Sequence, residues 1–247
     1  MSIVSLENVV VKFDSFVAVN GISLRVQAGE VLGVLGGNGA GKSTTMKVIA
    51  GVLKETSGDV IIDGLSTKSV NESERIKELT GYCPDVGGLI VGATPREHIQ
   101  LLLNMHHRPE DYPLALSALT AVGLGDKIDS PTGGFSHGES RRLSVLLASL
   151  SSQKVLILDE PFDGVDPLGA EAIKSIIAFA KARGLAVLVC THLQSLLVEV
   201  SDRVIIMRKG NILKMAEADY FRGEEGVRRY ADIMRAAAAE ASEVVFA

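Results

Sequence analysis

One glycine-rich stretch, Gly36 to Thr44, constrains the fold of this chain more than any other feature. Its sequence, Gly-Gly-Asn-Gly-Ala-Gly-Lys-Ser-Thr, fits the phosphate-loop pattern G-x-x-x-x-G-K-[ST]. The apolar run 31–35 before it predicts a buried strand, and residues 43–53 after it predict a helix that ends near Gly51. A strand, a glycine loop and a helix in this order predict a loop that binds the phosphates of a nucleoside triphosphate.

The residues of this loop have different expected roles. The glycines let consecutive backbone N–H groups point at phosphate oxygens, and the helix N-terminus adds partial positive charge. Lys42 is expected to reach the β- and γ-phosphates, and the Ser43 hydroxyl to ligate Mg²⁺. The alternative, a glycine-rich turn before an ordinary helix, is disfavoured because all four fixed positions and both flanks match. The expected nucleotide contacts are Gly36, Gly37, Asn38, Gly39, Ala40, Gly41, Lys42, Ser43 and Thr44.

A second motif supplies the carboxylates that a magnesium–phosphate site needs. The apolar run 154–158 predicts a strand, and Asp159 and Glu160 follow it directly. Two acids at a strand end are often only part of a turn, but the upstream phosphate loop favours a functional pair. Asp159 is therefore expected to hold Mg²⁺, directly or through a water molecule, and Glu160 to act as the general base for the attacking water.

His192 and Phe13 are two further candidates for contact with a nucleotide. Residues 185–190 predict another buried strand, and His192 lies just beyond its carboxyl end, the side on which open α/β sheets bind ligands. His192 is therefore expected to touch the γ-phosphate, and the alternative is a residue beside a helix cap. Phe13 lies in the polar segment 12–15, where it is expected either to stack on a base or to pack in the core.

The rest of the pattern predicts an α/β fold with additions to the nucleotide-binding core. Alternation over residues 3–26 predicts antiparallel strands. The region 94–124 is helical in pattern, begins with a capping box of Thr94 and Glu97, and predicts an inserted helical subdomain. A hairpin is expected within 203–214. A helical tail is expected to follow it, with one stripe formed by Val227, Tyr230, Met234 and Ala238.

Composition disfavours several other classes of protein. The 247 residues are 47% apolar, which predicts a full core rather than disorder. The formal net charge of −5 gives no basic face for nucleic acid. The chain has no long uncharged apolar run and no signal-peptide pattern at its start, so membrane contact is expected only through a partner. Cys83 and Cys190 lie in separate apolar runs and predict reduced core thiols of a cytosolic protein.

The order of these motifs resembles the ATP-binding cassette of ABC transporters, and the resemblance covers residues 1 to about 216. It implies a P-loop NTPase core with a mainly parallel sheet, an N-terminal antiparallel β subdomain, and an α-helical subdomain inserted at about 86–150. Residues 217–247 would form a separate C-terminal helical tail. His192 then matches the switch histidine of the family, and Phe13 matches its adenine-stacking aromatic residue.

Two further segments match motifs of this family. Gly164-Val165-Asp166-Pro167 looks like its D-loop, so the resemblance adds Asp166 to the nucleotide contacts. Residues 135–143 occupy the place of the family signature, usually Leu-Ser-Gly-Gly-Gln, which completes the ATP site of the opposing subunit. Ser136 and Gly138 of this signature are kept, at a helix N-terminus that is expected to lie near the γ-phosphate.

Three residues depart from the family pattern. His137 and Glu139 replace a glycine and a glutamine of the signature. Asp85 stands where the family usually has the glutamine that senses Mg²⁺ and meets the transmembrane partner, so Asp85 is expected at both the nucleotide and the metal. Glu139 is expected near the opposing nucleotide, where its charge repels phosphate unless a protonated His137 offsets it. The loose signature, the Arg141-Arg142-Leu143 run and the Gly-Val-Asp-Pro loop look most like cassettes of the ABC-2 exporter group.

The resemblance implies an ATPase subunit of an ABC exporter that uses ATP and Mg²⁺. A separate transmembrane permease subunit would hold the cassette at the cytoplasmic face of the membrane. The apolar loop within residues 85–99 is expected to line the groove of the cassette that receives this permease. A second cassette, identical or different, would close the ATP sites. The alternatives are a non-transport ABC ATPase, which the single phosphate loop and the lack of extended heptads disfavour, and a regulatory cassette with weak turnover. Glu139 and Asp85 favour the regulatory cassette, whereas Glu160 and His192 disfavour it.

Overall fold

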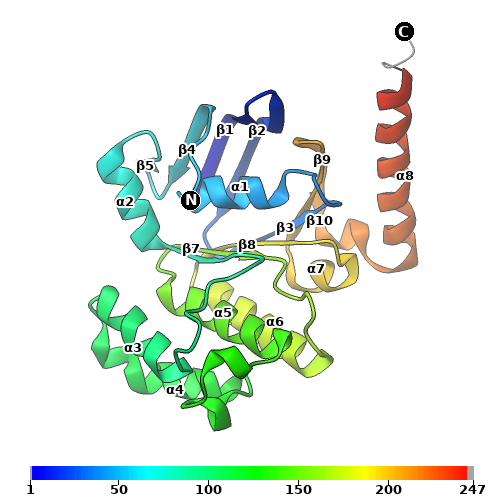
Figure 1. The fold of residues 1–247 in the computed structure, drawn as a ribbon. Coiled ribbons are helices and arrows are strands. Elements are labelled where there is room, and N and C mark those ends of the chain that lie inside the picture. The colour runs from blue at the N-terminus through cyan, green and yellow to red at the C-terminus, as the bar shows by residue number, and fades with distance from the viewer. Residues whose placement is uncertain (1, 244–247) are drawn as a thin grey trace.

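The computed structural model describes residues 2–243, which form two β-sheets with helices packed around them (Figure 1). The larger sheet has six strands in the order β10-β9-β3-β8-β7-β6, and all neighbours in it are parallel except β9 and β10. Its central strands β3, β7 and β8 are buried along their whole length, as expected where both faces of a parallel sheet are covered. The strands are β3 (Val31–Leu35), β6 (Thr80–Cys83), β7 (Val155–Asp159), β8 (Ala186–Thr191), β9 (Arg203–Arg208) and β10 (Asn211–Glu217).

The second sheet is the antiparallel one that the alternation at the N-terminus predicts. Its four strands have the order β2-β1-β4-β5 and pair antiparallel throughout. Helix α1 packs between the two sheets, so side chains from both sheets and from α1 share one hydrophobic core (Figure 1). The elements are β1 (Ser2–Phe13), β2 (Phe16–Gln27), α1 (Lys42–Ile49), β4 (Ser57–Ile62) and β5 (Leu65–Ser66).

Helix α1 is shorter than the sequence predicts. It ends at Ile49, just before the expected end near Gly51 and short of the predicted span 43–53. The reason is local, because Gly51 adopts a left-handed φ of 67° and the amide groups of Val52 and Leu53 both donate to the Lys47 carbonyl. The chain then leaves the helix and enters β4.

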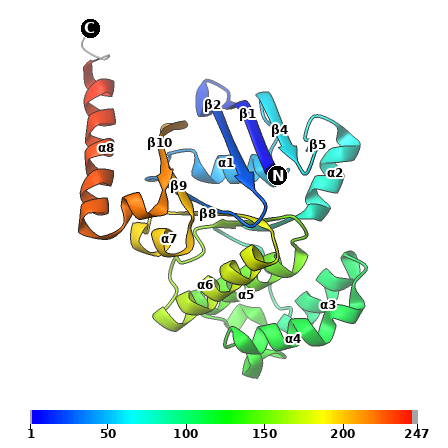
Figure 2. The same ribbon diagram turned by 180° about the vertical axis from the view of Figure 1, so that it is seen from behind.

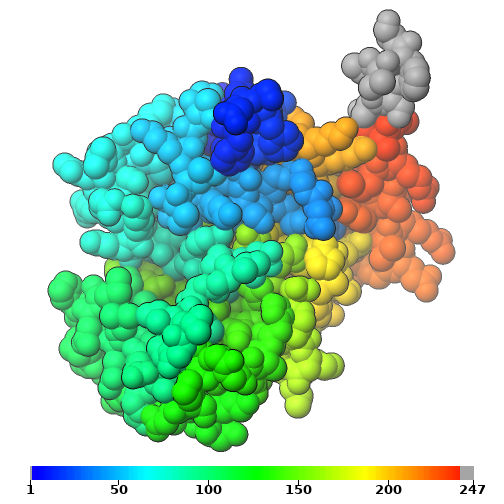
Figure 3. All heavy atoms as spheres, viewed as in Figure 1, coloured from blue at the N-terminus to red at the C-terminus, as the bar shows by residue number. Residues whose placement is uncertain are grey.

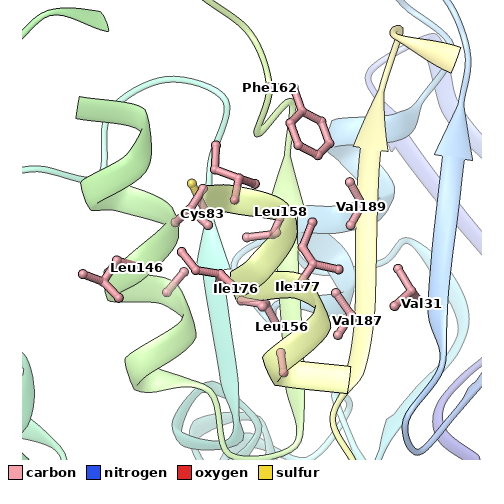
Figure 4. Packing of buried hydrophobic residues seen from close by; sticks show 14 of the residues in the cluster. Val31, Cys83, Leu146, Leu156, Leu158, Phe162, Ile176, Ile177, Val187 and Val189 are labelled. Carbon is pink, nitrogen blue, oxygen red and sulfur yellow. The ribbon is translucent and has the colours of Figure 1, made fainter. Parts of the chain in front are cut away.

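Three helices cover the other face of the larger sheet. They are α5 (His137–Ser151), α6 (Pro167–Ala182) and α7 (Gln194–Val200), and they share the second hydrophobic core with the sheet. Figure 4 shows side chains of α5 and α6 facing those of β7 and β8. The labelled residues in this layer include Leu146, Ile176, Ile177, Leu156, Leu158, Val187 and Val189.

The helical region that interrupts the alternation contains α3 (Pro95–Met105) and α4 (Tyr112–Ala121), which pack beside α5. Thr94 and Glu97 form the predicted capping box, with Pro95 at the first turn. Figure 3 shows these helices in green as the lower part of the molecule, opposite the blue and cyan N-terminal part. On the N-terminal side, α2 (Val70–Leu79) packs against β5 and β6.

The tail forms helix α8 (Gly223–Glu243), which stands beside the body in both ribbon views (Figures 1 and 2). Tyr230, Ile233 and Met234 pack against the second core. Of the predicted stripe, Tyr230 and Met234 therefore pack on the body of the chain, whereas Val227 and Ala238 are exposed. Helical spacing identifies residues that share a face, but only the line of contact with the body decides which of them become buried.

Both cysteines are buried and unbridged, as the sequence predicts, Cys83 on β6 and Cys190 on β8. Within residues 2–243, none of the helices combines the length and the apolar content that crossing a bilayer requires.

Candidate active site

The phosphate loop joins β3 to α1 and is held by close backbone packing. A Cβ atom at Gly36 would lie 2.5 Å from the Met207 carbonyl oxygen, and one at Gly41 would lie 2.5 Å from a carbonyl oxygen of β2. Gly41 also has a φ of 99°, which favours glycine. A Cβ atom at Gly37 or Gly39 would meet nothing within 4 Å. Gly36 and Gly41 are therefore required for packing, whereas Gly37 and Gly39 border open space.

Lys42 begins α1 and is only 6% exposed. Its Nζ donates to the Gly36 carbonyl oxygen at 2.8 Å and lies 3.4 Å from Glu160 Oε1. A buried ammonium group needs such partners, since an unpaired charge in this position is strongly unfavourable. Phosphate oxygens entering the loop can take over the same donors through charge-assisted hydrogen bonds.

The Asp159 carboxylate ends β7 and is 1% exposed. Its Oδ1 accepts a hydrogen bond from Ser43 Oγ at 3.1 Å and another from Cys190 Sγ at 2.6 Å. Burial raises the pKa of Asp159, and the hydrogen bonds from Cys190 and Ser43 act against that rise. Its Oδ2 is buried and has no hydrogen-bond partner within residues 2–243. One oxygen of this buried carboxylate therefore lacks a ligand.

Mg²⁺ fits this place by its chemistry. The Ser43 hydroxyl and the unpartnered Oδ2 of Asp159 are oxygen donors of the kind that Mg²⁺ prefers, and the two side chains are already in contact. A nearby cation would also favour the ionised form of a carboxylate whose pKa burial raises. Asp85 borders the same cleft with a side chain that is 48% exposed. Ser43, Asp159 and Asp85 therefore stay the predicted metal ligands.

Glu160 directly follows β7 and adopts a left-handed backbone with a φ of 50°, which is uncommon for a non-glycine residue. Its Oε2 accepts hydrogen bonds from the backbone N of His192 at 3.2 Å and from the ring Nδ1 of His192 at 3.0 Å. Its other carboxylate oxygen faces Lys42. The structure thus brings three predicted catalytic residues into one chain of contacts, Lys42–Glu160–His192.

An open cleft of about 420 Å³ lies over the phosphate loop. It brings together most of the predicted nucleotide contacts, with Asp85 and Glu160 opposite the loop. Its lining residues are Gly37, Asn38, Gly39, Ala40, Gly41, Lys42, Ser43, Thr44, Asp85 and Glu160. Five other predicted contacts lie outside this lining, namely Phe13, Gly36, Ser136, Gly138 and Asp166.

Phe13 ends β1 and pairs directly with Phe16 of β2 across a tight turn. The two residues are 47% and 60% exposed, so neither ring is part of the core. Ala18, two residues beyond Phe16 on the same strand, packs against Gly41 of the phosphate loop. The strand that leaves the β1–β2 turn therefore passes close to the phosphate loop. The stacking of Phe13 on a base stays a prediction.

Ser136 caps α5 through a reciprocal capping box with Glu139. Ser136 Oγ accepts from the Glu139 backbone N at 3.2 Å, and Glu139 Oε2 accepts from the Ser136 backbone N at 2.9 Å. Lys127 Nζ lies 2.6 Å from Glu139 Oε1. The hydrogen bond from Lys127, followed by that from the Ser136 backbone, lowers the pKa of Glu139. The partner of this charge is therefore Lys127 rather than the predicted His137, whose ring Nε2 lies 3.8 Å from Asp163.

A buried arginine of the signature segment holds the Asp85 segment, a contact that the sequence does not predict. Arg141 of α5 is 5% exposed, and its Nη1 donates to the Pro84 carbonyl oxygen at 2.8 Å. Its Nη2 donates to the Asp85 carbonyl oxygen and lies 3.5 Å from Asp85 Oδ1. A guanidinium group has enough donors to bind several carbonyls at once. The signature helix is thus tied to the end of β6.

The D-loop lies against the signature helix. A Cβ atom at Gly138 would lie 3.2 Å from the Gly164 carbonyl oxygen, so the two segments meet closely at this glycine. Asp166 caps α6, and its Oδ1 accepts from the Gly169 backbone N at 2.8 Å. In this structure the Asp166 carboxylate therefore serves the helix cap, and its nucleotide contact stays a prediction.

Comparison with known proteins places this geometry in a family. The family model described as ABC transporter matches residues 19–163. The ATP-binding protein LptB of the lipopolysaccharide export system of Haemophilus influenzae is 30% identical over 235 residues, covering 93% of this chain and 96% of that protein. ATP-binding cassette sub-family A member 10 of Homo sapiens is 33% identical over 213 residues, covering 85% of this chain. This chain spans only 14% of that human protein's length.

The fold agrees with these matches. A dimeric structure of a bacterial ABC transporter cassette superposes with a TM-score of 0.81 at 24% identity, covering 89% of this chain and 99% of that chain. This likeness confirms the predicted P-loop core with its antiparallel and mainly parallel sheets. The phosphate loop, the two acids after β7 and the signature position occur in the order that the sequence predicts. The chain therefore belongs to the ABC transporter family, as one of its ATP-binding cassettes.

Proposed function

We propose that this chain hydrolyses ATP and drives a separate transmembrane permease, most like those of the ABC-2 exporter group. The observation that carries the proposal is the single cleft lined by Lys42, Ser43 and Glu160, with the buried Asp159 carboxylate in contact with Ser43. Binding alone requires only the loop, whereas a carboxylate beside the buried Lys42 supplies a base for hydrolysis. Release of phosphate by the purified chain, measured with and without Mg²⁺, tests this function directly.

In the proposed reaction a water molecule attacks the γ-phosphorus of ATP. A P–O bond to this water forms, the bond to the ADP oxygen breaks, and Glu160 accepts a proton from the water. His192 orients Glu160 by donating from its backbone N and from a protonated Nδ1. Lys42 holds the phosphates of the substrate and offsets their charge. Mg²⁺, when bound by Ser43, Asp159 and Asp85, supplies further charge neutralisation on the phosphate oxygens.

The same proposal requires a second cassette. Ser136 and Gly138 lie at the start of α5, outside the lining of the cleft over the phosphate loop. The exposed N-terminus of a 15-residue helix suits the phosphates of another chain, as in the family pattern. The dimeric cassette described above supports such an assembly, and the second cassette is either a copy of this chain or a different one. Binding of ATP then joins the cassettes, and its hydrolysis releases them.

The altered signature does not oppose turnover. The Glu139 charge that favours a regulatory cassette is paired with Lys127 at 2.6 Å within the same chain. Its repulsion of phosphate is therefore reduced, and ATP hydrolysis is favoured over a role limited to ATP binding.

The domain boundaries predicted from the sequence stay part of this proposal, with a cassette at 1–216, a helical insert at about 86–150 and a tail at 217–247.

Removing the partner of Glu139 is expected to weaken ATP-driven dimerisation. In a Glu160→Gln background, Lys127→Met leaves the Glu139 charge unpaired and raises the dimer dissociation constant about two- to fivefold, the range for a partly exposed pair. Glu139→Gln added to Lys127→Met is expected to restore dimerisation. The dimer fraction with ATP is measured by size-exclusion chromatography with light scattering. Lys77→Met, which breaks the exposed pair with Glu74, is the control. Equal dimerisation in all variants would show that the signature charge has no effect.

The loop after β6 is proposed to meet the permease at the cytoplasmic face of the membrane. Val86, Ile90 and Val91 are 84%, 53% and 89% exposed, a concentration of apolar surface that water does not favour. The backbone of Ile90 is nevertheless held in place by two hydrogen bonds. Its N donates to His98 Nε2 at 2.8 Å, and its carbonyl oxygen accepts from Thr132 Oγ1 at 3.1 Å. A fixed apolar residue suits a docking surface.

Ile90→Glu is expected to disrupt coupling to the permease while the cassette stays folded, because the Ile90 side chain is largely in solvent. Leu89→Glu is expected to destabilise the cassette itself by about 1–3 kcal/mol, since Leu89 packs on the core. ATP-driven transport in vesicles that contain the permease, together with the melting temperature, separates the two effects. Val70→Glu on α2, at a residue 78% exposed, is the matched control. Normal transport by Ile90→Glu would place the docking surface elsewhere.

A further inference from the structure

The position of Cys190 beside the Asp159 carboxylate has a role that the nucleotide motifs do not assign. Cys190 lies on β8 directly opposite Asp159 in the parallel pairing of β7 and β8. Because paired residues of neighbouring strands point to the same face, their side chains meet. The Sγ of Cys190 is 2.6 Å from Asp159 Oδ1, and Cys190 is completely buried. The contact therefore follows from the strand register itself.

The two oxygens of Asp159 have unequal surroundings. Oδ1 accepts from both the Cys190 thiol and the Ser43 hydroxyl, whereas Oδ2 is buried without a partner among residues 2–243. Ser43 is itself a predicted metal ligand, but ligation uses a lone pair of its oxygen, so its O–H can still donate to Oδ1. The thiol of Cys190 is the second donor to the same oxygen. The two donors on Oδ1 oppose rotation of the carboxylate and leave Oδ2 free.

We propose that Cys190 is a positioning residue for the metal site, which fixes the rotation of the Asp159 carboxylate so that Oδ2 stays available to Mg²⁺. This inference rests on the proposed function, since it requires Asp159 to hold the metal of a bound nucleotide. Residues that orient a metal ligand through a hydrogen bond contribute to metal affinity although they do not touch the metal. A thiol is a weak donor, but here it meets a carboxylate oxygen in a fully buried position.

The other buried thiol provides a matched control. Cys83 is 1% exposed and also lies at the carboxyl end of a strand of the larger sheet. Its Sγ lies 4.0 Å from Arg141 Nη1 and bonds the Pro84 carbonyl rather than the Asp159 carboxylate. Replacement of Cys83 therefore changes a buried thiol beside the same sheet edge without removing the donor to Asp159.

The test is a calorimetric titration of ATP into Glu160→Gln cassettes, with Mg²⁺ and with EDTA. Cys190→Val has a similar volume and no donor, and it is expected to reduce the gain in ATP affinity caused by Mg²⁺ by about 10- to 100-fold. The affinity in EDTA is expected to stay unchanged, because the contacts of the phosphate loop do not involve Cys190. Cys190→Ser, which keeps a donor, and Cys83→Ser are both expected to retain the full gain.

The outcomes separate this inference from the function on which it rests. A full Mg²⁺ gain in Cys190→Val, or an equal loss in Cys190→Ser and Cys190→Val, would overturn the role of the thiol donor while the metal site stands. If the parent Glu160→Gln protein gains no affinity from Mg²⁺, the proposed metal site itself fails. Melting temperatures in EDTA identify any variant that is misfolded, and Cys190→Ala replaces Cys190→Val in that case.

Discussion

Replacing Glu160 by glutamine is expected to lower ATP turnover by about 10²- to 10⁴-fold while ATP binding is retained. Glutamine has the shape of glutamate and keeps an oxygen for the backbone N of His192, but it has no carboxylate to take a proton from water. It also ends the ion pair with Lys42, which leaves the ammonium group free for phosphate. Phosphate release and ATP titration on the same preparation measure the two effects.

Glu171→Gln is the matched control for this substitution. It removes a carboxylate of α6 that is 69% exposed and pairs with Lys174 on the same helix, so turnover is expected to stay normal. Hydrolysis by Glu160→Gln at the wild-type rate would remove Glu160 from the role of base. Loss of binding together with turnover would mean that the substitution disturbs the loop rather than the chemistry.

Lys42→Ala is expected to weaken ATP binding by at least about 100-fold, the range found when one partner of a buried charged contact is truncated. The substitution removes the cation that faces the phosphates and leaves Glu160 Oε1 without its ammonium partner. The net charge of the cleft therefore becomes more negative, although the cleft must admit a polyanion. Equilibrium binding of a fluorescent ATP analogue gives the size of the effect.

Lys47→Ala is the corresponding control, because Lys47 is an exposed lysine in the last turn of the same helix α1. It is expected to bind ATP normally. If Lys42→Ala binds ATP as well as this control does, the buried ammonium group serves the fold of the loop and not the nucleotide.

Local motifs predict the parts of the site that follow one another in the chain. The loop from Gly36 to Thr44 and the strand that ends at Asp159 were both identifiable, because each motif lies within one short segment. The apolar runs before them form the fully buried strands β3 and β7. Placement of Glu160 beside Lys42 also follows, since β3 and β7 both border β8 in the same parallel sheet.

Long-range contacts were not predictable in the same way. Lys127 reaches Glu139 from a short 3-10 helix (Gly125–Lys127), Arg141 reaches the end of β6, and Cys190 meets Asp159 only through the register of two strands. No local pattern predicts these contacts, because they depend on how separate elements pack. The tail shows the same limit, since spacing in α8 does not say that Ile233, rather than Val227, contacts the body.

The most direct test of the account is an experimental structure of the Glu160→Gln protein with ATP and Mg²⁺. The account predicts phosphates enclosed by the loop 36–44 beside Lys42, and a cation that contacts Ser43 and lies within reach of Asp159. It also predicts a second cassette whose Ser136 and Gly138 face the γ-phosphate. Nucleotide bound away from the loop, or a cation with neither Ser43 nor Asp159 near it, would contradict the account.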